Sequence, residues 1–335
     1  MINRYYGSFA PGLQHVIAEV LGEGLPDLRI VRLLEGAAVF DTALSYDRLN
    51  SLCFNNVFQV IDMANRPEAL EAWIADAAAR RSRVVAENSR KIRSFRVIFS
   101  RENVPAALGE KLRNHVENCI SRESGLTVNR SRPDTEFWFL YRREGGGLCL
   151  FMKRLTRRPS FDKSLHQGEL PPPVAWTLCR LSNPKAGERV ADPFCGYGAI
   201  PQARLRHFPP AEFFASDIDA AALARTRDKF RGKTCCHVNR IDAGELGRII
   251  PPASLDAVIT DPPWGFHEKL PCPIEEFYTR NLAVFARLLK DGGRGVFLCG
   301  RGEEFGTAGE KTGFTVTRNI PILLSGKKAA ILVLR

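Results

Sequence analysis

Asp261, Pro262, Pro263 and Trp264 place a carboxylate, two rigid prolines and a large aromatic ring directly after an apolar segment. Proline has no amide hydrogen and fixes its backbone, so the two prolines hold the loop extended and leave carbonyl oxygens without local donors. Asp261 and the carbonyl of Pro262 can then both accept hydrogen bonds from one amino group. This arrangement would turn the lone pair of an exocyclic base amine toward a methyl donor, so that transfer depends mainly on positioning.

Trp264 adds a flat face on which a base taken out of its stack can lie. Asp261 can also take the proton that the amine releases. A double proline after a strand also occurs in structural turns, but an aspartate before it and an aromatic ring after it favour a catalytic loop. We therefore expect these residues to direct methyl transfer to an amino nitrogen.

The loop at residues 192–198 is the candidate site for the methyl donor. Its two glycines, directly after a strand, let the backbone turn sharply and approach a ligand closely. A dinucleotide site would have a third glycine three residues later, where this sequence has Pro201. Asp192 would repel a pyrophosphate but attract the sulfonium and ammonium groups of S-adenosylmethionine, which favours that cofactor over NAD. The predicted cofactor-binding residues of this loop are Asp192, Phe194, Cys195, Gly196 and Gly198.

Two further acidic loops follow the next two predicted strands. Asp217 lies about 20 residues beyond the glycine loop, where a carboxylate accepts hydrogen bonds from ribose hydroxyls, and Ile218 would flank the adenine ring. Asp242, followed by Ala243, can accept a hydrogen bond from the adenine amino group. Each acid alone could be a helix N-cap or a turn residue. Their joint placement after three successive strands favours an adenosine site.

The elements that position these loops alternate between strand and helix from about residue 171 onward. This alternation predicts an α/β fold with a doubly wound parallel sheet, which presents its ligand at the carboxyl ends of the strands. An apolar segment at 329–334 predicts a last strand, at the antiparallel edge of the sheet. The segments that carry the pattern are 171–181, 189–191, 201–207, 212–216, 220–230, 257–260, 274–289 and 295–298.

The first half of the chain has a different, α+β pattern. Helical spacing of apolar residues predicts helices, and alternating apolar residues predict strands. The expected helices are 12–21, 47–53, 67–79 and 104–121. The expected strands are 30–34, 36–40, 95–100, 136–141 and 147–152, the last two joined by a turn at 144–146.

Composition places the chain among soluble globular proteins, with 44% hydrophobic and 25% charged residues. No apolar run reaches the roughly 20 residues that cross a bilayer, and the N-terminus lacks the apolar core of a signal peptide. We expect a cytoplasmic protein with no membrane partner, and a monomer is favoured. The nine irregularly spaced cysteines indicate reduced thiols, with no metal site, because Cys235-Cys236-His237 lacks a second ligand pair.

Positive charge is concentrated in the middle of the chain. The net charge of the whole chain is +11, and residues 80–165 alone hold 20 Lys and Arg against 9 Asp and Glu. Such a segment is typical of a surface that binds a polyanion, although a solvated arginine-rich surface would give the same count.

These motifs together resemble the THUMP-domain RNA guanine-N2 methyltransferases. The loop at 192–198 resembles that family's Asp-Pro-Phe-Cys-Gly-Ser-Gly-Thr, and residues 261–265 are similar to its Asp-Pro-Pro-Tyr-Gly. Residues 157–175, with Gly168-Glu169-Leu170-Pro171 inside, look like the segment that links the THUMP and catalytic domains and covers the cofactor. Residues 128–134 and the strands after them resemble the THUMP core.

The resemblance implies three domains: a ferredoxin-like domain over 1–90, a THUMP RNA-binding domain over 91–160 and a Rossmann-like class I methyltransferase domain over 161–335. It implies N2-methylation of a guanosine with S-adenosylmethionine as cofactor, on a structured RNA for which the Asp-Pro-Pro form favours tRNA. The candidate phosphate contacts are Arg130, Arg132, Arg142, Arg143, Arg154, Arg157 and Arg158.

The sequence departs from the family pattern at a few positions. Tyr197 and Ala199 replace a small Ser and Thr, and Trp264 replaces Tyr, which keeps the stacking face but loses the hydroxyl. These changes leave the target nucleotide open. An rRNA or DNA amino-methyltransferase would share the same catalytic loop. A non-catalytic RNA-binding protein is the other alternative, against which the joint presence of four loop aspartates argues.

Overall fold

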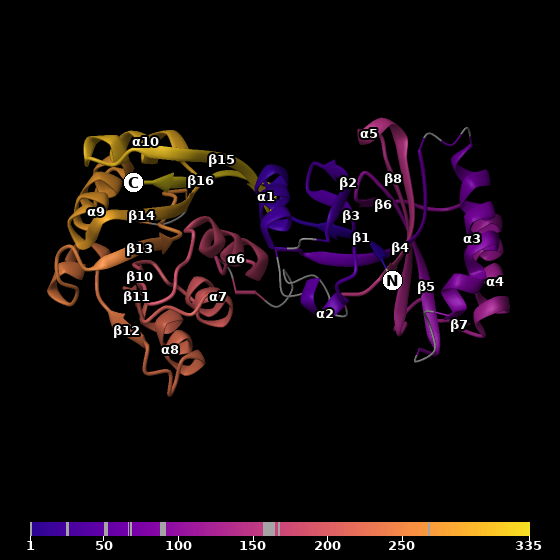
Figure 1. Cartoon of the computed structure of the whole chain (residues 1–335), viewed down its shortest axis with the longest axis horizontal. Coiled ribbons are helices and arrows are strands. Elements are labelled where there is room, and N and C mark those ends of the chain that lie inside the picture. The colour runs from indigo at the N-terminus through magenta and orange to yellow at the C-terminus, as the bar shows by residue number, and fades with distance from the viewer. Residues whose placement is uncertain are drawn as a thin grey trace. The chain divides into compact units, whose positions relative to one another are not determined.

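The computed structural model in Figure 1 divides the chain into two compact units. Unit 1 comprises Met1–Phe9 and Gln14–Ser160, and unit 2 comprises Ala10–Leu13 and Phe161–Arg335. The structure describes residues 2–24, 27–49, 53–65, 67, 69–87, 92–156, 165–166, 168–266 and 269–335.

Unit 1 is built, within the residues described, on one nine-stranded sheet of order β2-β3-β1-β4-β9-β8-β5-β6, with β7 beside β5. The pairs β5–β8 and β5–β7 are parallel and the other pairs are antiparallel. Its strands are β1 (Asn3–Ser8), β2 (Arg29–Leu34), β3 (Ala37–Thr42), β4 (Asn56–Asn65), β5 (Ser94–Arg101), β6 (Val104–Pro105), β7 (Thr127–Val128), β8 (Thr135–Arg142) and β9 (Leu148–Arg154). Pairing of β4 with β9 therefore joins the segments before and after residue 90 in one sheet.

Two helices cover one face of this sheet, as Figure 1 shows for α3 (Leu70–Glu87) and α4 (Glu110–Ser124). Side chains alternate between the two faces of a strand. Phe151 accordingly joins the core under these helices, while its neighbours Leu150 and Met152 join a separate cluster. The remaining helices of the unit are α1 (Gln14–Gly24), α2 (Tyr46–Leu49) and α5 (Glu144–Gly147).

Unit 2 contains, over the described parts of residues 165–335, a seven-stranded sheet of order β12-β11-β10-β13-β14-β16-β15. Strands β10 to β14 run parallel, and β16 and β15 are antiparallel. The strands are β10 (Arg189–Asp192), β11 (Glu212–Asp217), β12 (Cys236–Arg240), β13 (Leu255–Thr260), β14 (Leu289–Cys299), β15 (Val316–Leu324) and β16 (Lys327–Leu334). From β10 the chain steps outward to β12, and then returns to β13 on the other side of β10. This reversal opens a crevice between the loops that follow β10 and β13.

Helix α6 (Pro172–Leu181) precedes this sheet. The helices that connect its strands are α7 (Ala199–His207), α8 (Ala220–Lys229), the short 3₁₀ helix η2 (Ala243–Arg248), α9 (Ile274–Leu288) and α10 (Gly302–Lys311). A large apolar core forms where α9 and α10 pack on the sheet, and it includes Phe285, Phe297 and Phe305. At the other end of β10 from the crevice, Glu188 is buried with Arg204 and accepts from its Nη2 at 2.6 Å, and Arg294 contacts the same carboxylate.

Some predicted elements need correction. The helix expected over 104–121 is α4, which begins at Glu110 because Pro105 lies in β6 and Gly109 caps the helix. The strand expected at 329–334 is antiparallel, as predicted, but it lies inside the sheet, because the unpredicted strand β15 takes the edge. Helix α10 was also not predicted. No helix in the described part of the chain has the length and apolar character needed to span a bilayer.

Candidate functional site

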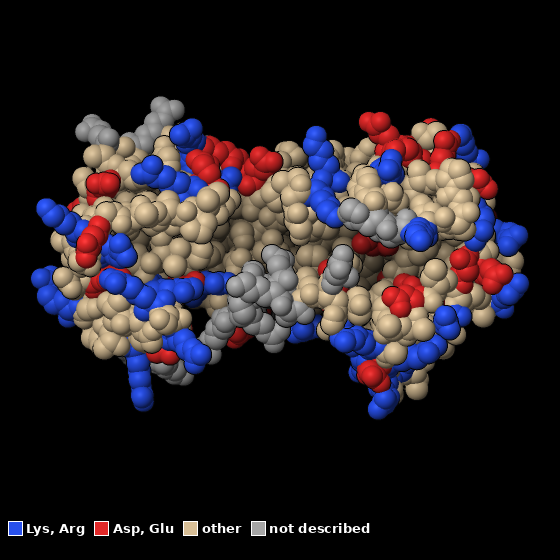
Figure 2. Space-filling view, turned by 180° about the vertical axis from the view of Figure 1, so that it is seen from behind, with Lys and Arg blue, Asp and Glu red and all other residues tan. Residues whose placement is uncertain are grey.

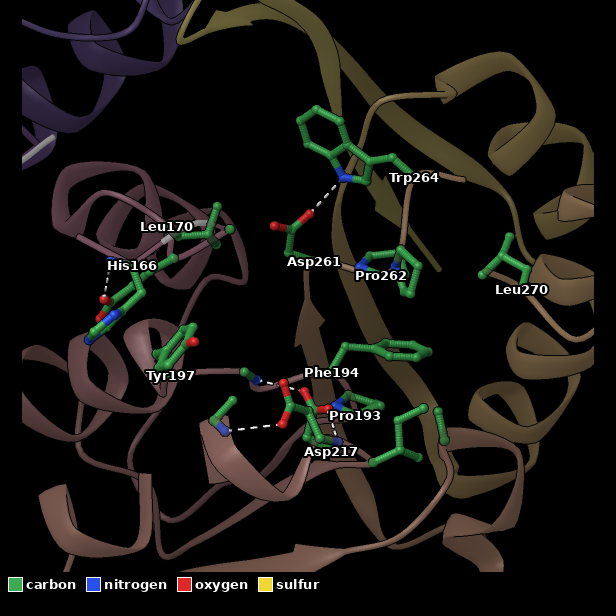
Figure 3. Close-up of a pocket in the computed structure, with 18 of the residues that line it drawn as sticks. His166, Leu170, Pro193, Phe194, Tyr197, Asp217, Asp261, Pro262, Trp264 and Leu270 are labelled. Atoms are coloured by element: carbon green, nitrogen blue, oxygen red, sulfur yellow. Dashed lines mark hydrogen bonds between the residues drawn. The ribbon is translucent and has the colours of Figure 1, made fainter. Parts of the chain in front are cut away.

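A cavity of about 1200 Å³ lies in unit 2 at the carboxyl ends of the parallel strands. The loops after β10, β11, β12 and β13 all contribute to it, as the strand order requires. In Figure 3, Asp217 and Asp261 border the same space, with His166, Leu170 and Tyr197 on one side and Leu270 on the other. The structure thus brings together the loops that the sequence marked separately.

The glycine loop after β10 depends on two left-handed backbone positions. Gly196 has φ 46° and Gly198 has φ 80°, values that side chains other than glycine rarely adopt. A Cβ at Gly198 would also lie 3.0 Å from Oγ1 of Thr226. The amide of Gly196 donates to Oδ2 of Asp217 at 2.8 Å, so the second loop holds the first in place.

The acids of the second and third loops line the cavity and also stabilise their own loops. Asp217 accepts from the amide of Asp219 at 2.9 Å, and Ile218 beside it is 64% exposed, which leaves an apolar surface for a flat ring. Asp242 is the N-cap of η2 and accepts from Gly244 and from Arg280, both at 2.8 Å. Asp242 is therefore the N-cap that its sequence position allowed, and it also lines the cavity. Ala243 also lines the cavity.

Asp192 does not face the cavity, and here the sequence argument needs correction. Its side chain is 1% exposed and lies beneath the glycine loop, where Oδ1 accepts from Oγ1 of Thr260 at 2.6 Å. Burial raises the pKa of Asp192 well above its usual range, and the Thr260 hydrogen bond offsets this only in part. Cys195 is likewise buried, and neither it nor Gly198 lines the cavity, whereas Phe194 and Gly196 do. The carboxylates available to a cationic ligand are instead Asp217, Asp219, Asp242, Asp261 and Glu169.

Among the described residues, three hydrogen bonds help to hold the loop after β13. The indole Nε1 of Trp264 donates to Oδ1 of Asp261 at 2.8 Å, the bond drawn in Figure 3. The Tyr278 hydroxyl donates to the carbonyl of Pro263 at 2.9 Å, and Nε of Arg301 donates to the carbonyl of Trp264 at 3.0 Å. Within the described ranges no donor reaches the carbonyl of Pro262, so this carbonyl and Asp261 can both accept from an incoming amine.

Sequence reasoning missed the residues that support this loop. Tyr278 lies on α9, and burial raises its pKa, so its hydroxyl stays a donor. Gly300 lies beneath the indole, since a Cβ there would come within 2.4 Å of the Trp264 ring. The guanidinium of Arg301 lies 4.9 Å from the centre of the Phe266 ring, which meets Trp264 edge to face. Tyr278 has the spacing of a core residue, so no sequence pattern distinguished it.

The segment before α6 closes one side of the cavity. His166 stacks on Tyr197 with ring centres 4.5 Å apart. Lys229 donates to Glu169 at 3.0 Å and to the carbonyl of Tyr197 at 2.7 Å, which ties this segment to the glycine loop. Residues 157–164 and 167 of the same segment lie outside the described residues.

The predicted phosphate-binding arginines of unit 1 occupy unequal positions. Arg142 is only 6% exposed, and its guanidinium donates a hydrogen bond to Glu144 at 2.6 Å. The prediction that it contacts phosphate is therefore wrong, because its guanidinium is buried within unit 1. Arg154 is bound by Glu136 and Asn56, at 3.0 and 2.8 Å. Three others are exposed: Arg130, Arg132 and Arg143. Of these, Arg130 pairs with Glu117. Arg157 and Arg158 lie outside the described residues.

Ion pairing reduces the positive surface that the charge count suggested. Arg80 pairs with Asp62 and Asp76, and Arg96 with Glu136. On the face drawn in Figure 2, Lys and Arg side chains are interspersed with Asp and Glu. Asp62 and Asp76 therefore offset part of the net charge of residues 80–165, whereas the Arg96–Glu136 pair is already counted in it.

Comparison with known proteins identifies a matching family and a similar known fold. The family model described as RMKL-like, methyltransferase domain (UPF0020) matches residues 159–326. The chain is 30% identical over 206 residues to the tRNA (guanine(6)-N2)-methyltransferase of Thermus thermophilus, a match that covers 60% of each protein. It is 37% identical over 163 residues to the tRNA (guanine(10)-N2)-dimethyltransferase of Methanothermobacter thermautotrophicus, covering 44% of each. These matches thus span less than two thirds of either relative.

The crystal structure of TrmN from Thermus thermophilus matches this structure with a TM-score of 0.81, over 100% of this chain and 99% of that chain. The sequence identity is 23%, so the likeness concerns the fold. It confirms the α/β fold predicted from the alternation of strands and helices, and the class I methyltransferase-like architecture that the family resemblance implied.

Proposed function

The chain belongs to the RMKL-like methyltransferase domain family, and on that premise we propose that it transfers a methyl group from S-adenosylmethionine to the exocyclic N2 amino group of a guanosine in tRNA. The names of both sequence relatives described above specify N2 methylation of a tRNA guanosine. The reaction belongs to unit 2, which holds both the glycine loop and the loop after β13.

One observation carries the proposal: Oδ1 of Asp261 accepts, at 2.8 Å, a hydrogen bond from the N–H of a planar ring system inside the cavity. A base amine offers the same kind of donor. With one hydrogen on Asp261 and the other on the carbonyl of Pro262, the amine nitrogen is oriented for in-line transfer. The Tyr278 hydroxyl and Arg301 fix the next two carbonyls, which keeps this acceptor pair in place.

The cavity fits S-adenosylmethionine, which supplies an electrophilic methyl group when bound. Asp217 lies at the position where a carboxylate accepts hydrogen bonds from ribose hydroxyls, and the exposed side chain of Ile218 offers an apolar face for adenine. Asp219 adds negative charge that matches the sulfonium and ammonium groups, whereas Glu169 and Asp242 are paired with Lys229 and Arg280. Asp192 acts indirectly, from beneath the loop, by accepting from the amide of Phe194 at 3.3 Å.

We further propose that unit 1 contains the ferredoxin-like and THUMP domains, over residues 1–90 and 91–160, and binds structured RNA. The exposed side chains of Arg130, Arg132 and Arg143 support this role, since exposed guanidinium groups can contact phosphates. Arg157 and Arg158 stay in the proposed set, and Arg142 leaves it.

The test is methyl transfer from labelled S-adenosylmethionine to tRNA, rRNA and DNA in parallel, followed by nucleoside analysis. We expect N2-methylguanosine in tRNA only. Asp261→Asn should reduce transfer by at least about a hundredfold, because the amide presents a donor where an acceptor is needed and misplaces the amine. Asp228→Asn is the matched control, since Asp228 is exposed on α8 and pairs with Arg231 away from the cavity.

Methylation of DNA or rRNA alone would overturn the tRNA substrate. Equal transfer by Asp261→Asn and wild type would overturn the catalytic loop. Binding of RNA without any transfer, in a protein that still binds the cofactor, would point to the non-catalytic alternative.

A further inference from the structure

Phe266 presents an aromatic ring to solvent beside the loop that we propose holds the target amine. It is 45% exposed, and among the residues that the structure describes it is the only exposed Phe, Tyr or Trp. Its ring meets that of Trp264 edge to face, with the ring centres 6.2 Å apart and 87° between the ring planes. Trp264 lines the cavity and Phe266 does not. The exposed ring therefore lies just outside the cavity, in contact with a residue of its lining.

Arg301 holds the Phe266 ring in place. Its guanidinium lies over the ring, 4.9 Å from the centre, an arrangement in which a cation and an aromatic face attract each other. The same guanidinium is fixed by the carbonyl of Trp264, at 3.0 Å, and by Glu304, at 3.2 Å. A ring held by these contacts loses little conformational freedom when a second flat group packs on it, so it is prepared for binding.

The proposed reaction leaves a flat group without a partner. An enzyme that modifies a base of a structured RNA takes that base out of its stack, so the neighbouring base loses a stacking partner. An aromatic side chain can replace this partner, whichever base it is, because every base has a π face. Since the rings of Phe266 and Trp264 are almost perpendicular, they cannot extend one stack. They suit two bases that are turned away from each other, as the target and its neighbour then are.

We propose that Phe266 stacks on the base that neighbours the target guanosine in the RNA, with Arg301 as the positioning residue of the ring. This inference rests on the proposed function, because it takes the target base to enter at Asp261. The contact belongs to unit 2 and lies outside the pocket for the target base. Free guanosine has no neighbouring base and cannot use it.

The first test measures this contact without methyl transfer, in the whole protein saturated with S-adenosylhomocysteine. The probes are the RNA trinucleotide UpGpU and the same trinucleotide with both flanking nucleotides abasic. Wild type should bind UpGpU about tenfold more tightly, which is within the range for stacking of one base on an aromatic ring. Phe266→Ala should lose this preference and still bind the abasic probe like wild type, whereas Phe266→Tyr keeps the ring and should keep the preference.

Ile249→Ala is the matched control, since it removes an apolar side chain of unit 2 that is 40% exposed and outside the cavity lining. It should retain the preference. Equal binding of the two probes by wild type, or a preference that survives in Phe266→Ala, would overturn the proposal. An equal loss on both probes in Phe266→Ala would also overturn it, because the ring would then only support the Trp264 loop.

The second test is steady-state methyl transfer to tRNA. Phe266→Ala should raise KM for tRNA about tenfold and leave KM for S-adenosylmethionine unchanged, while Phe266→Tyr stays near wild type. An unchanged KM for tRNA in Phe266→Ala would contradict the stacking contact and leave the proposed function intact. Failure of wild type to methylate any RNA would instead defeat the proposed function, and the comparison of the two probes would still report on stacking.

Discussion

The indole N–H of Trp264 occupies, at 2.8 Å, the same Oδ1 of Asp261 that we propose as an acceptor for the target amine. A base amine that takes the acceptor position now held by the indole replaces one N–H donor by another on this oxygen. Such an exchange keeps the number of hydrogen bonds constant, so its net free energy is small. Trp264 is also the position at which this loop departs from the Asp-Pro-Pro-Tyr pattern.

Trp264→Phe removes the N–H donor and keeps an aromatic face. Because the entering amine then no longer competes with the indole N–H for Oδ1 of Asp261, we expect KM for tRNA to fall by up to about tenfold, the equivalent of one hydrogen bond. Trp264→Ala should raise KM about tenfold or more, since stacking on a base is worth about 1–3 kcal/mol. Steady-state kinetics on both variants measures the difference. If Trp264→Phe raised KM as much as Trp264→Ala does, the hydrogen bond from Trp264 to Asp261 would assist binding of the base instead of competing with it.

Gly300→Ala should disable the catalytic loop through Trp264. The added Cβ would lie 2.4 Å from the indole, so the ring must leave its place over the backbone. We expect activity to fall about tenfold or more, the scale on which small misplacements act in catalysis. In the Trp264→Ala background the same substitution should have little further effect, since the clash is gone. Additive losses in the double variant would show that Gly300 acts independently of Trp264.

Asp192→Asn should flatten the pH dependence of stability. The folded-state pKa of Asp192 is raised by burial, so the folded protein binds a proton that the unfolded protein has released. The stabilisation that Asp192 contributes is therefore greatest below the pKa of an aspartate in the unfolded chain, about 4. It declines as the pH rises above that value. Urea unfolding at several pH values should show a smaller decline in Asp192→Asn than in wild type. Parallel pH profiles would mean that Asp192 is ionised in the folded protein.

Glu188→Ala should destabilise unit 2 without touching the cavity. Glu188 and Arg204 are both almost fully buried, so removal of the carboxylate leaves a guanidinium without its counterion. The expected loss is about 3–5 kcal/mol in the free energy of unfolding. Glu275→Ala breaks the exposed pair with Lys311 and should cost at most about 1 kcal/mol. Denaturant titration of both variants compares the two pairs, and equal losses would contradict the assigned role of Glu188.

The parallel strands of unit 2 and the loops that follow them were predictable from the sequence. Apolar strands such as Leu255–Thr260 carry a local signal, and the carboxyl ends of parallel strands meet at one edge of the sheet. The residue pattern alone was therefore enough to place Asp217, Asp242 and Asp261 together.

Contacts between distant segments were beyond sequence reasoning. Arg301 reaches the carbonyl of Trp264 from the loop after β14, and no local pattern in either segment indicates that pairing. The burial of Asp192 depends on Thr260 in a neighbouring strand. Strand β15 escaped detection because an edge strand has one solvated face, so that it lacks the continuous apolar run of its neighbours.

The late position of β16 in the chain has a consequence for protein synthesis. Strand β14 gains its outer neighbour only when β16 emerges from the ribosome, after α10 and β15, so β14 is an open edge until then. The turn between β15 and β16, where Leu324, Ser325 and Lys327 line the cavity, forms in the same step. A nascent chain can thus fold its cofactor loops while one wall of the cavity is still missing, and the complete cavity forms only when the hairpin closes.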